Sequence, residues 1–308
     1  MFSPMPASIS AISLNSLSKR YGKLVAVKDL SLEVRQGEVF GFLGLNGAGK
    51  TTTIRILLDL LRPTSGSAQV LGHNCQSESR TVRSLAGYLP GEFGFYGDMS
   101  GSATLEFLAR LCKQKIDSHY RVQLEERLEF PRSDLRRKIR EYSTGMKRKL
   151  GLIQAFQSDP ALLILDEPTE GLDPLMQESF YELLSEAKNR GRTIFMSSHV
   201  LSEVERVCDR IAVIRQGEIV VVSEVEEVKK LAARKVRVEF SEDCDFRSRE
   251  LPAGHEFIDS NLRTWNLRVY GSLGQLVSLL GELPVRDLEV EEPHLEDVLM
   301  KYYREDGE

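Results

Sequence analysis

Gly44-Leu45-Asn46-Gly47-Ala48-Gly49-Lys50-Thr51 is the stretch of sequence that decides the fold. A short apolar run at 39–43 precedes it, and a segment of helical character at 51–61 follows it and stops before Pro63. Glycines let the backbone curl so that successive N–H groups can point at phosphate oxygens, at the positive end of the following helix. The Lys50 ammonium can reach the outer phosphates, and the Thr51 hydroxyl can ligate Mg²⁺. We therefore predict a nucleotide site formed by Gly44, Leu45, Asn46, Gly47, Ala48, Gly49, Lys50, Thr51 and Thr52.

A second apolar run ends in two carboxylates: Leu162-Leu163-Ile164-Leu165-Asp166-Glu167. Ligands of open α/β sheets bind at the carboxyl ends of the strands. Asp166 suits a Mg²⁺ ligand because magnesium prefers hard oxygen ligands and keeps several waters. Glu167 is placed to orient or deprotonate an attacking water. Such a run is common where any strand meets a loop, so its weight comes from the phosphate loop upstream.

The hydrophobic pattern predicts an α/β fold. Apolar runs at 39–43, 161–165 and 193–196 predict buried strands, whereas 100–160 and 175–190 have helical spacing. Helices that alternate with apolar strands favour a mostly parallel sheet with helices on its faces. Residues 11–43 are predicted to form strands and turns.

The character of the sequence changes after about residue 222. Val236, Val238 and Phe240 alternate with polar residues, and so do Leu267 and Val269. Helical spacing at 273–283, a strand near 288–290 and a terminal helix from His294 complete the pattern. We expect a separate small α/β domain over 223–308.

Bulk composition excludes several classes of protein. The chain has 308 residues, 41% of them hydrophobic and 28% charged, and a net charge of −5. The basic run at 136–140 is short, and such runs are more often solvated helix faces, so we expect no nucleic-acid partner. Neither a secretory signal nor an apolar stretch of about 20 residues is recognisable. Four scattered cysteines predict reduced thiols: Cys75, Cys112, Cys208 and Cys244.

In this order, the motifs resemble those of the nucleotide-binding subunits of ATP-binding cassette (ABC) transporters, over about residues 12–222. Tyr21 lies where that family places an aromatic that stacks on adenine. Residues 142–146, Tyr-Ser-Thr-Gly-Met, match the family signature, usually Leu-Ser-Gly-Gly-Gln. Residues 171–173 match the loop after the catalytic Glu, and Ser197-Ser198-His199 matches the switch histidine. Each match is weak alone, because Tyr21 by itself is more typical of a half-buried aromatic and His199 by itself of a hydrogen-bonded structural histidine.

The resemblance implies a domain organisation. A P-loop NTPase core with a mostly parallel sheet would span 11–222, including an N-terminal antiparallel β-subdomain and a helical subdomain near 92–157. An accessory α/β domain, 223–308, would follow. Two copies would face head to tail and trap two ATP molecules, each phosphate loop being completed by Ser143 and Gly145 of the other copy.

It also implies roles for single residues. Lys50 and His199 would supply charge and hydrogen bonds to the phosphates, and Glu167 would act on the water. Thr51 and Asp166 would hold Mg²⁺, and Asp173 would contact the nucleotide. ATP and Mg²⁺ are the expected cofactors.

Two departures from the family pattern stand out. Thr144 and Met146 replace a Gly and the Gln of the signature, and Gly91 stands where a Gln normally touches the Mg²⁺ site and links it to the membrane partner. We hypothesise that Glu92 or a water takes over that link. Three aromatic residues follow, which either pack inside the helical subdomain or form an exposed groove for a permease helix: Phe93, Phe95 and Tyr96.

Three features resemble the export branch that handles drugs, antibiotics and polysaccharides: the segment 87–92, the C-terminal extension and its ending at 293–299. This resemblance implies an ATPase homodimer at the cytoplasmic face of the membrane with a separate membrane-spanning permease. The alternative is a soluble ABC-type ATPase that acts in translation or cofactor assembly. Cargo stays open at this point.

Overall fold

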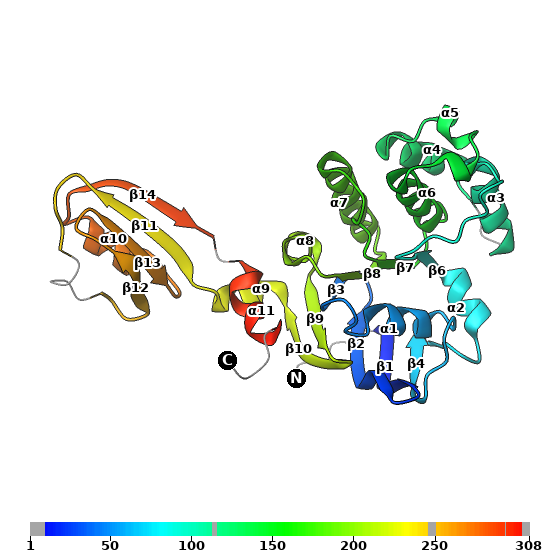
Figure 1. Cartoon of the computed structure of the whole chain (residues 1–308), viewed down its shortest axis with the longest axis horizontal. Coiled ribbons are helices and arrows are strands. Elements are labelled where there is room, and N and C mark those ends of the chain that lie inside the picture. The colour runs from blue at the N-terminus through cyan, green and yellow to red at the C-terminus, as the bar shows by residue number, and fades with distance from the viewer. Residues whose placement is uncertain (1–9, 113–115, 246–250, 293, 304–308) are drawn as a thin grey trace, which may run out of the picture. The chain divides into compact units, whose positions relative to one another are not determined.

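The computed structural model describes residues 10–112, 116–245, 251–292 and 294–303. The chain divides into two compact units between Val222 and Ser223 (Figure 1). Each unit has its own sheets and its own hydrophobic core. Among the described residues, no helix is both long enough and apolar enough to cross a bilayer.

A six-stranded sheet forms the centre of the first unit, in the order β10-β9-β3-β8-β7-β6. Its strands are β3 (Val39–Leu43), β6 (Ala86–Leu89), β7 (Leu162–Asp166), β8 (Thr193–Ser198), β9 (Arg210–Arg215) and β10 (Glu218–Glu224). The ladders β3–β8, β3–β9, β6–β7 and β7–β8 are parallel. Every residue of β3, β7 and β8 is buried, which explains why these strands read as continuous apolar runs. The predicted α/β class with a mostly parallel central sheet is confirmed.

A second sheet of the first unit is antiparallel and has the order β2-β1-β4-β5. It contains β1 (Ser10–Tyr21), β2 (Leu24–Arg35), β4 (Ser65–Val70) and β5 (His73–Asn74). Leu14 pairs with Leu32, and Leu17 with Leu30, so the apolar side chains of both strands lie on one face. These residues share a buried cluster with Phe40 of β3.

Helices of the first unit surround the central sheet (Figure 1). They are α1 (Lys50–Leu57), α2 (Ser79–Leu85), α3 (Gly101–Leu111), α4 (Ser118–Arg127), α5 (Arg132–Leu135), the 3₁₀ turn η1 (Ile139–Glu141), α6 (Thr144–Phe156), α7 (Pro174–Asn189) and α8 (Leu201–Val207). The prediction that the first helix reaches residue 61 was wrong. It ends at Leu57 because Asp59 adopts the left-handed conformation (φ 51°), which breaks the helical hydrogen-bond ladder.

The second unit is a four-stranded antiparallel sheet with three helices. Its strand order is β12-β13-β11-β14. The elements are α9 (Val225–Leu231), β11 (Arg234–Phe240), β12 (His255–Ser260), β13 (Thr264–Val269), α10 (Gly274–Leu280), β14 (Val285–Glu291) and α11 (Leu295–Tyr303). Trp265 is fully buried, and its indole N–H donates to the carbonyl of Cys244 at 3.1 Å. The last five residues of the expected 223–308 domain lie outside the described part of the chain.

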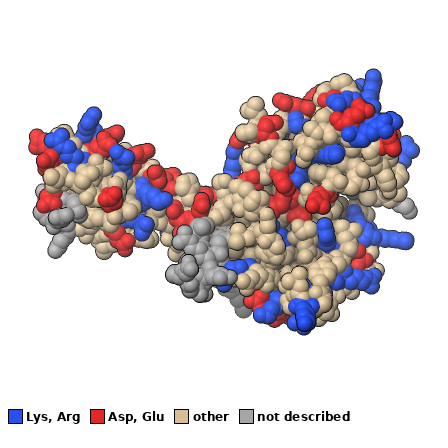
Figure 2. Space-filling view, viewed as in Figure 1, with Lys and Arg blue, Asp and Glu red and all other residues tan. Residues whose placement is uncertain are grey.

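Charges of both signs are interspersed on the face of the molecule that Figure 2 shows. Within the basic run at 136–140, Arg137 pairs with Asp134 and Glu141, and Arg140 pairs with Asp98 at 2.8 Å. Local acidic partners therefore offset part of the positive charge of this run. All four cysteines are free thiols.

Candidate active site

The phosphate loop connects β3 to α1, and its glycines are required by its geometry. Gly49 has φ 114°, and a Cβ atom there would lie 2.6 Å from the carbonyl oxygen of Ala26. A Cβ at Gly44 would lie 2.5 Å from the carbonyl oxygen of Ile214. Only glycine fits both positions without a shift of backbone, so the loop can curl tightly around an anion.

Lys50 is the first residue of α1 and is 5% exposed. Its ammonium donates to the carbonyl of Gly44 and lies 3.4 Å from that of Leu45. The loop's own carbonyls thus hold the lysine over the curled backbone. Thr51 and Thr52 follow in the first turn of α1, where unpaired N–H groups favour negative charge.

Glu167 occupies a strained position directly after β7. Its φ is 48°, a left-handed conformation that is uncommon outside glycine and costs about 1–3 kcal/mol at such sites. Its N–H donates to the Ser197 hydroxyl at 3.1 Å. Its Oε1 lies 3.1 Å from Lys50 Nζ, and its Oε2 lies 2.8 Å from His199 Nδ1. The structure therefore brings the three predicted catalytic residues together at the carboxyl ends of β3, β7 and β8.

Asp166 ends β7 and has one satisfied and one unsatisfied oxygen. Oδ1 accepts a hydrogen bond from the Ser197 hydroxyl at 2.6 Å. Oδ2 is buried and has no hydrogen-bond partner among the residues that the structure describes. A buried carboxylate oxygen without a donor is costly unless a cation or water satisfies it, so Asp166 fits the predicted role of a Mg²⁺ ligand.

Two supporting residues of the site were not recognised from the sequence. Ser197 bridges Asp166 to the Glu167 backbone, whereas the sequence motif that contains it assigns a role only to His199. Glu203 on α8 is 8% exposed and accepts hydrogen bonds from Thr169 and Ser198, the latter at 3.0 Å. It therefore ties the loop after β7 to the end of β8. No local pattern marks Glu203, since its partners lie far from it or on another element.

Ser143 and Asp173 begin helices rather than contact the phosphate loop of their own chain. The Ser143 hydroxyl accepts from Met146 N–H at 3.2 Å and caps α6. The Asp173 carboxylate accepts from Met176 N–H at 3.0 Å and caps α7. A Cβ at Gly145 would lie 3.2 Å from the carbonyl oxygen of Gly171, so the two predicted loops are packed together. For these residues to contact a nucleotide as predicted, that nucleotide would have to be bound in the phosphate loop of a second copy.

Tyr21 is 47% exposed at the end of β1. Lys19 places its ammonium 5.1 Å from the centroid of the tyrosine ring. The ring is accessible enough to stack on a flat base, and its role in adenine binding stays a prediction.

The aromatic residues after Gly91 divide between the two predicted alternatives. Phe93 is half-buried and stacks on Phe95, with 5.1 Å between ring centroids. Tyr96 is 65% exposed and meets the edge of Phe107, itself 38% exposed. Packing therefore accounts for the first two aromatics, whereas Tyr96 extends into solvent beside α3.

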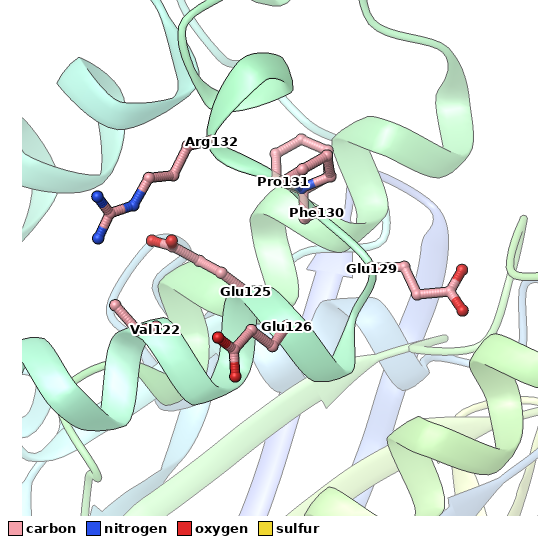
Figure 3. A pocket seen from close by; sticks show the side chains of 7 residues that line it. All are labelled: Val122, Glu125, Glu126, Glu129, Phe130, Pro131 and Arg132. Atoms are coloured by element: carbon pink, nitrogen blue, oxygen red, sulfur yellow. The ribbon is translucent and has the colours of Figure 1, made fainter.

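Two pockets of the first unit have none of the predicted catalytic residues among their described lining residues. One of about 580 Å³ lies among α4, α5 and the turn between them, and Figure 3 shows the side chains that line it. Its lining carries three glutamates and one arginine among apolar residues: Val122, Glu125, Glu126, Glu129, Phe130, Pro131 and Arg132. This chemistry does not suit a phosphate.

The chain is similar in sequence to known proteins. The family model described as ABC transporter matches residues 27–170. The bacitracin transport ATP-binding protein BcrA of Bacillus licheniformis is 36% identical over 234 residues, which cover 75% of each chain. This chain belongs to the ABC transporter ATP-binding proteins. It is therefore an ATP-binding and ATP-hydrolysing transporter subunit.

Other members of the ABC family share its sequence or its fold. The Nod factor export ATP-binding protein I of Burkholderia orbicola is 37% identical over 212 residues, covering 68% of this chain and 69% of that protein. A dimeric ATP-binding cassette solved with ADP and phosphate has a TM-score of 0.63 and 20% identity, covering 70% of this chain and 98% of the other. At that identity the likeness shows the fold alone.

Proposed function

We propose that this ABC protein hydrolyses Mg²⁺-bound ATP as a head-to-tail homodimer and thereby drives a separate export permease. The observation that carries the proposal is the meeting of Lys50, Glu167 and His199 at one edge of the sheet. The names of two relatives contain the words transport and export, which supports the proposed coupling of ATP hydrolysis to an export permease. They favour it over a soluble role in translation or cofactor assembly.

The residues of this chain act mainly by positioning and charge, as phosphoryl transfer requires. Lys50 offers its ammonium to the outer phosphates once the Glu167 carboxylate releases it. Glu167 then turns toward the attacking water, and His199 holds its second oxygen. A Mg²⁺ ion held by Thr51 and Asp166 would supply further positive charge to the phosphate oxygens.

Two copies are needed to complete each site in this proposal. Ser143 stands at the N-terminus of α6, a helix of 13 residues whose positive end favours phosphate. Gly145 and Asp173 lie beside it. A cassette of the same fold has been solved as a dimer. In our proposal this helix end faces the phosphate loop of the other copy.

An apolar and basic surface on the first unit suits a permease. Tyr96 and Leu111 are 65% and 63% exposed, and Leu111 also lines a pocket of about 670 Å³ between α2 and α3. Arg80 and Arg83 line the same pocket. We expect a permease helix with apolar residues and at least one carboxylate to dock here, at the cytoplasmic face of the membrane.

A pull-down tests the proposal. Tagged Glu167→Gln protein, expressed in the native cell and purified from gently solubilised membranes with ATP and Mg²⁺, should co-purify a polytopic membrane chain. Mass spectrometry of the co-purified chains would identify it. Recovery of ribosomal proteins or a soluble assembly partner, with no membrane chain, would overturn the export role.

Surface variants test the docking site. Tyr96→Glu and Leu111→Glu should each abolish co-purification of the permease and leave ATP hydrolysis by the isolated protein unchanged. Leu262→Glu is the matched control, because Leu262 is also an exposed leucine (51%) but lies in the second unit. Normal recovery of the permease with both first-unit variants would place its contact elsewhere.

A further inference from the structure

One buried arginine on α6 joins separate segments that border the active site. Arg148 is 2% exposed. Its Nε donates to the carbonyl of Glu170 at 2.9 Å, and its Nη2 lies 3.3 Å from the Glu170 carboxylate. Nη1 donates to the carbonyl of Pro90 and Nη2 to that of Gly91, both at 3.3 Å. A single guanidinium therefore fixes the backbone on both sides of it.

Removing the Arg148 guanidinium from water costs free energy, so its hydrogen-bond acceptors must compensate for the lost hydration. Burial lowers the pKa of Arg148, and the nearby carboxylates of Glu170, Asp166 and Glu167 counter part of that effect. Guanidinium groups stay charged in proteins, so the fold must compensate the lost hydration with acceptors. Three backbone carbonyls and one carboxylate do so here. The Phe93 ring adds a cation–π contact, with its centroid 5.0 Å from the guanidinium carbon.

Both segments held by Arg148 touch the residues proposed to act on ATP. Glu170 N–H donates to the carbonyl of Glu167 at 3.3 Å, closing a turn. On the other side, a Cβ at Gly91 would lie 3.4 Å from Asp166 Oδ2, the oxygen that lacks a donor. Gly91 has no side chain to reach that oxygen. The position of its backbone is therefore its whole contribution to the site.

α6 also shapes the path of the segment beyond Gly91. One turn after Arg148, a Cβ at Gly151 would lie 2.3 Å from the Phe93 ring and 2.8 Å from Leu89. The helix therefore accepts the Phe93 ring only because position 151 is glycine. Arg148 and Gly151 together hold residues 89–93 against α6, the helix that begins at Ser143.

We propose that Arg148 is a positioning residue for ATP hydrolysis, which fixes the 90–93 segment and the 167–170 turn around the Asp166 and Glu167 carboxylates. Glu92, which the sequence suggests as a link to the Mg²⁺ site, is exposed, and among described residues it has no hydrogen-bond or ion-pair partner. The inference rests on the proposed roles of Asp166 and Glu167.

Arg148→Lys is the decisive variant, because lysine keeps the charge but cannot serve several acceptors with a planar fork. We expect kcat for ATP hydrolysis to fall at least about 10-fold, since small misplacements of reacting groups have effects of that size or larger. The Kd of a fluorescent ATP analogue should stay within about twofold, because Arg148 does not contact the phosphate loop. Thermal unfolding is measured in parallel.

Arg210→Lys is the matched control. Arg210 pairs with Glu38 at 2.9 Å and lies over the Phe40 ring, but at the opposite end of β9 and β3 from the active site. It should lower the Tm similarly and leave kcat unchanged. Wild-type kcat in folded Arg148→Lys, or equal losses of kcat in both variants, would overturn the proposal.

Glu170→Ala gives an independent measurement should Arg148→Lys fail to fold. The Glu170 side chain is 66% exposed, so its removal spares the core and one of the four hydrogen bonds of Arg148 is lost. We expect kcat to fall about threefold with unchanged nucleotide affinity. Unchanged kcat would overturn the proposal. Normal turnover by Glu167→Gln would instead contradict the proposed role of Glu167, on which this inference rests.

Discussion

The Lys50 ammonium lies 3.1 Å from the Glu167 carboxylate, so the cation predicted to hold ATP is paired with the carboxylate predicted to orient water. Both side chains are largely buried, at 6% and 16% exposed. We therefore expect a phosphate that enters the loop to displace Glu167 from Lys50. The same movement would free Glu167 for the attacking water and would couple nucleotide binding to assembly of the site.

Glu167→Gln should bind ATP no more weakly than the natural protein, because the competing negative charge beside Lys50 is gone. Hydrolysis should fall by about 10²–10⁴-fold, the usual contribution of a general base. Phosphate release and binding of a fluorescent ATP analogue measure the two effects. Glu178→Gln, which changes an exposed carboxylate on α7 paired with Arg206, should be neutral. Full turnover by Glu167→Gln would remove Glu167 from this role.

Ser197→Ala should raise the Mg²⁺ concentration needed for half-maximal hydrolysis. It removes the donor to Asp166 and the acceptor of Glu167 N–H, and an orphaned buried group costs about 1–3 kcal/mol of stability. A Mg²⁺ titration and chemical unfolding measure these effects. Ser179→Ala, which removes an exposed hydroxyl bonded to Leu175 in α7, should change neither. An unaltered Mg²⁺ titration would contradict the bridging role.

Gly49→Ala should abolish ATP binding and destabilise the fold. The new Cβ would meet the carbonyl oxygen of Ala26 at 2.6 Å, at a position with φ 114°. Gly191→Ala separates the two causes, because Gly191 also has a positive φ (78°), but a Cβ added there would meet no atom within 4 Å. It should lose about 1 kcal/mol from the backbone alone and bind ATP normally. Equal behaviour of the two variants in equilibrium dialysis with ATP would refute the steric argument.

Stability should decrease as pH rises above 9. Burial raises the pKa of Cys75 to about 12 and that of Cys208 also upward, from a usual value of 9.0. Between the two values the unfolded chain has lost the thiol protons that the folded chain retains, so unfolding is favoured as pH increases. Urea unfolding at pH 8, 9 and 10 checks the slope. Cys75→Ala should start from lower stability but show a shallower slope, and an identical slope would contradict the assignment.

ATP should stabilise the first unit without shifting the unfolding of the second. Trp265 is the one tryptophan of the sequence and is buried in the second unit, so its fluorescence follows that unit. At 100 times its Kd, ATP should add about 2.7 kcal/mol to whatever it binds. Circular dichroism should therefore report a shifted transition that tryptophan fluorescence lacks. Equal shifts of both signals would show that the two units unfold together.

The sequence alone determined the parts of the site that depend on local backbone geometry. A tightly curled anion loop can be built only with glycine at positions such as Gly44 and Gly49, so the loop is recognisable from the pattern of glycines in the sequence. Likewise, a fully buried parallel strand must be a continuous apolar run, and its polar end must mark the edge of the sheet. These constraints predict Lys50, Asp166 and Glu167 near the carboxyl ends of buried strands from the sequence alone.

Only the tertiary structure decided how these residues are supported. Arg148 reaches Gly91 and Pro90 across more than fifty residues of sequence, and Ser197 reaches Asp166 across 31. Such contacts leave no periodicity, because each depends on which helix covers which strand end. The end of α1 at Leu57 was likewise not predictable from the sequence. Apolar residues keep a helical spacing beyond Asp59, although the left-handed conformation of Asp59 ends the helix. Local backbone geometry can be predicted from the sequence, whereas tertiary packing determines which residues pair with buried charges.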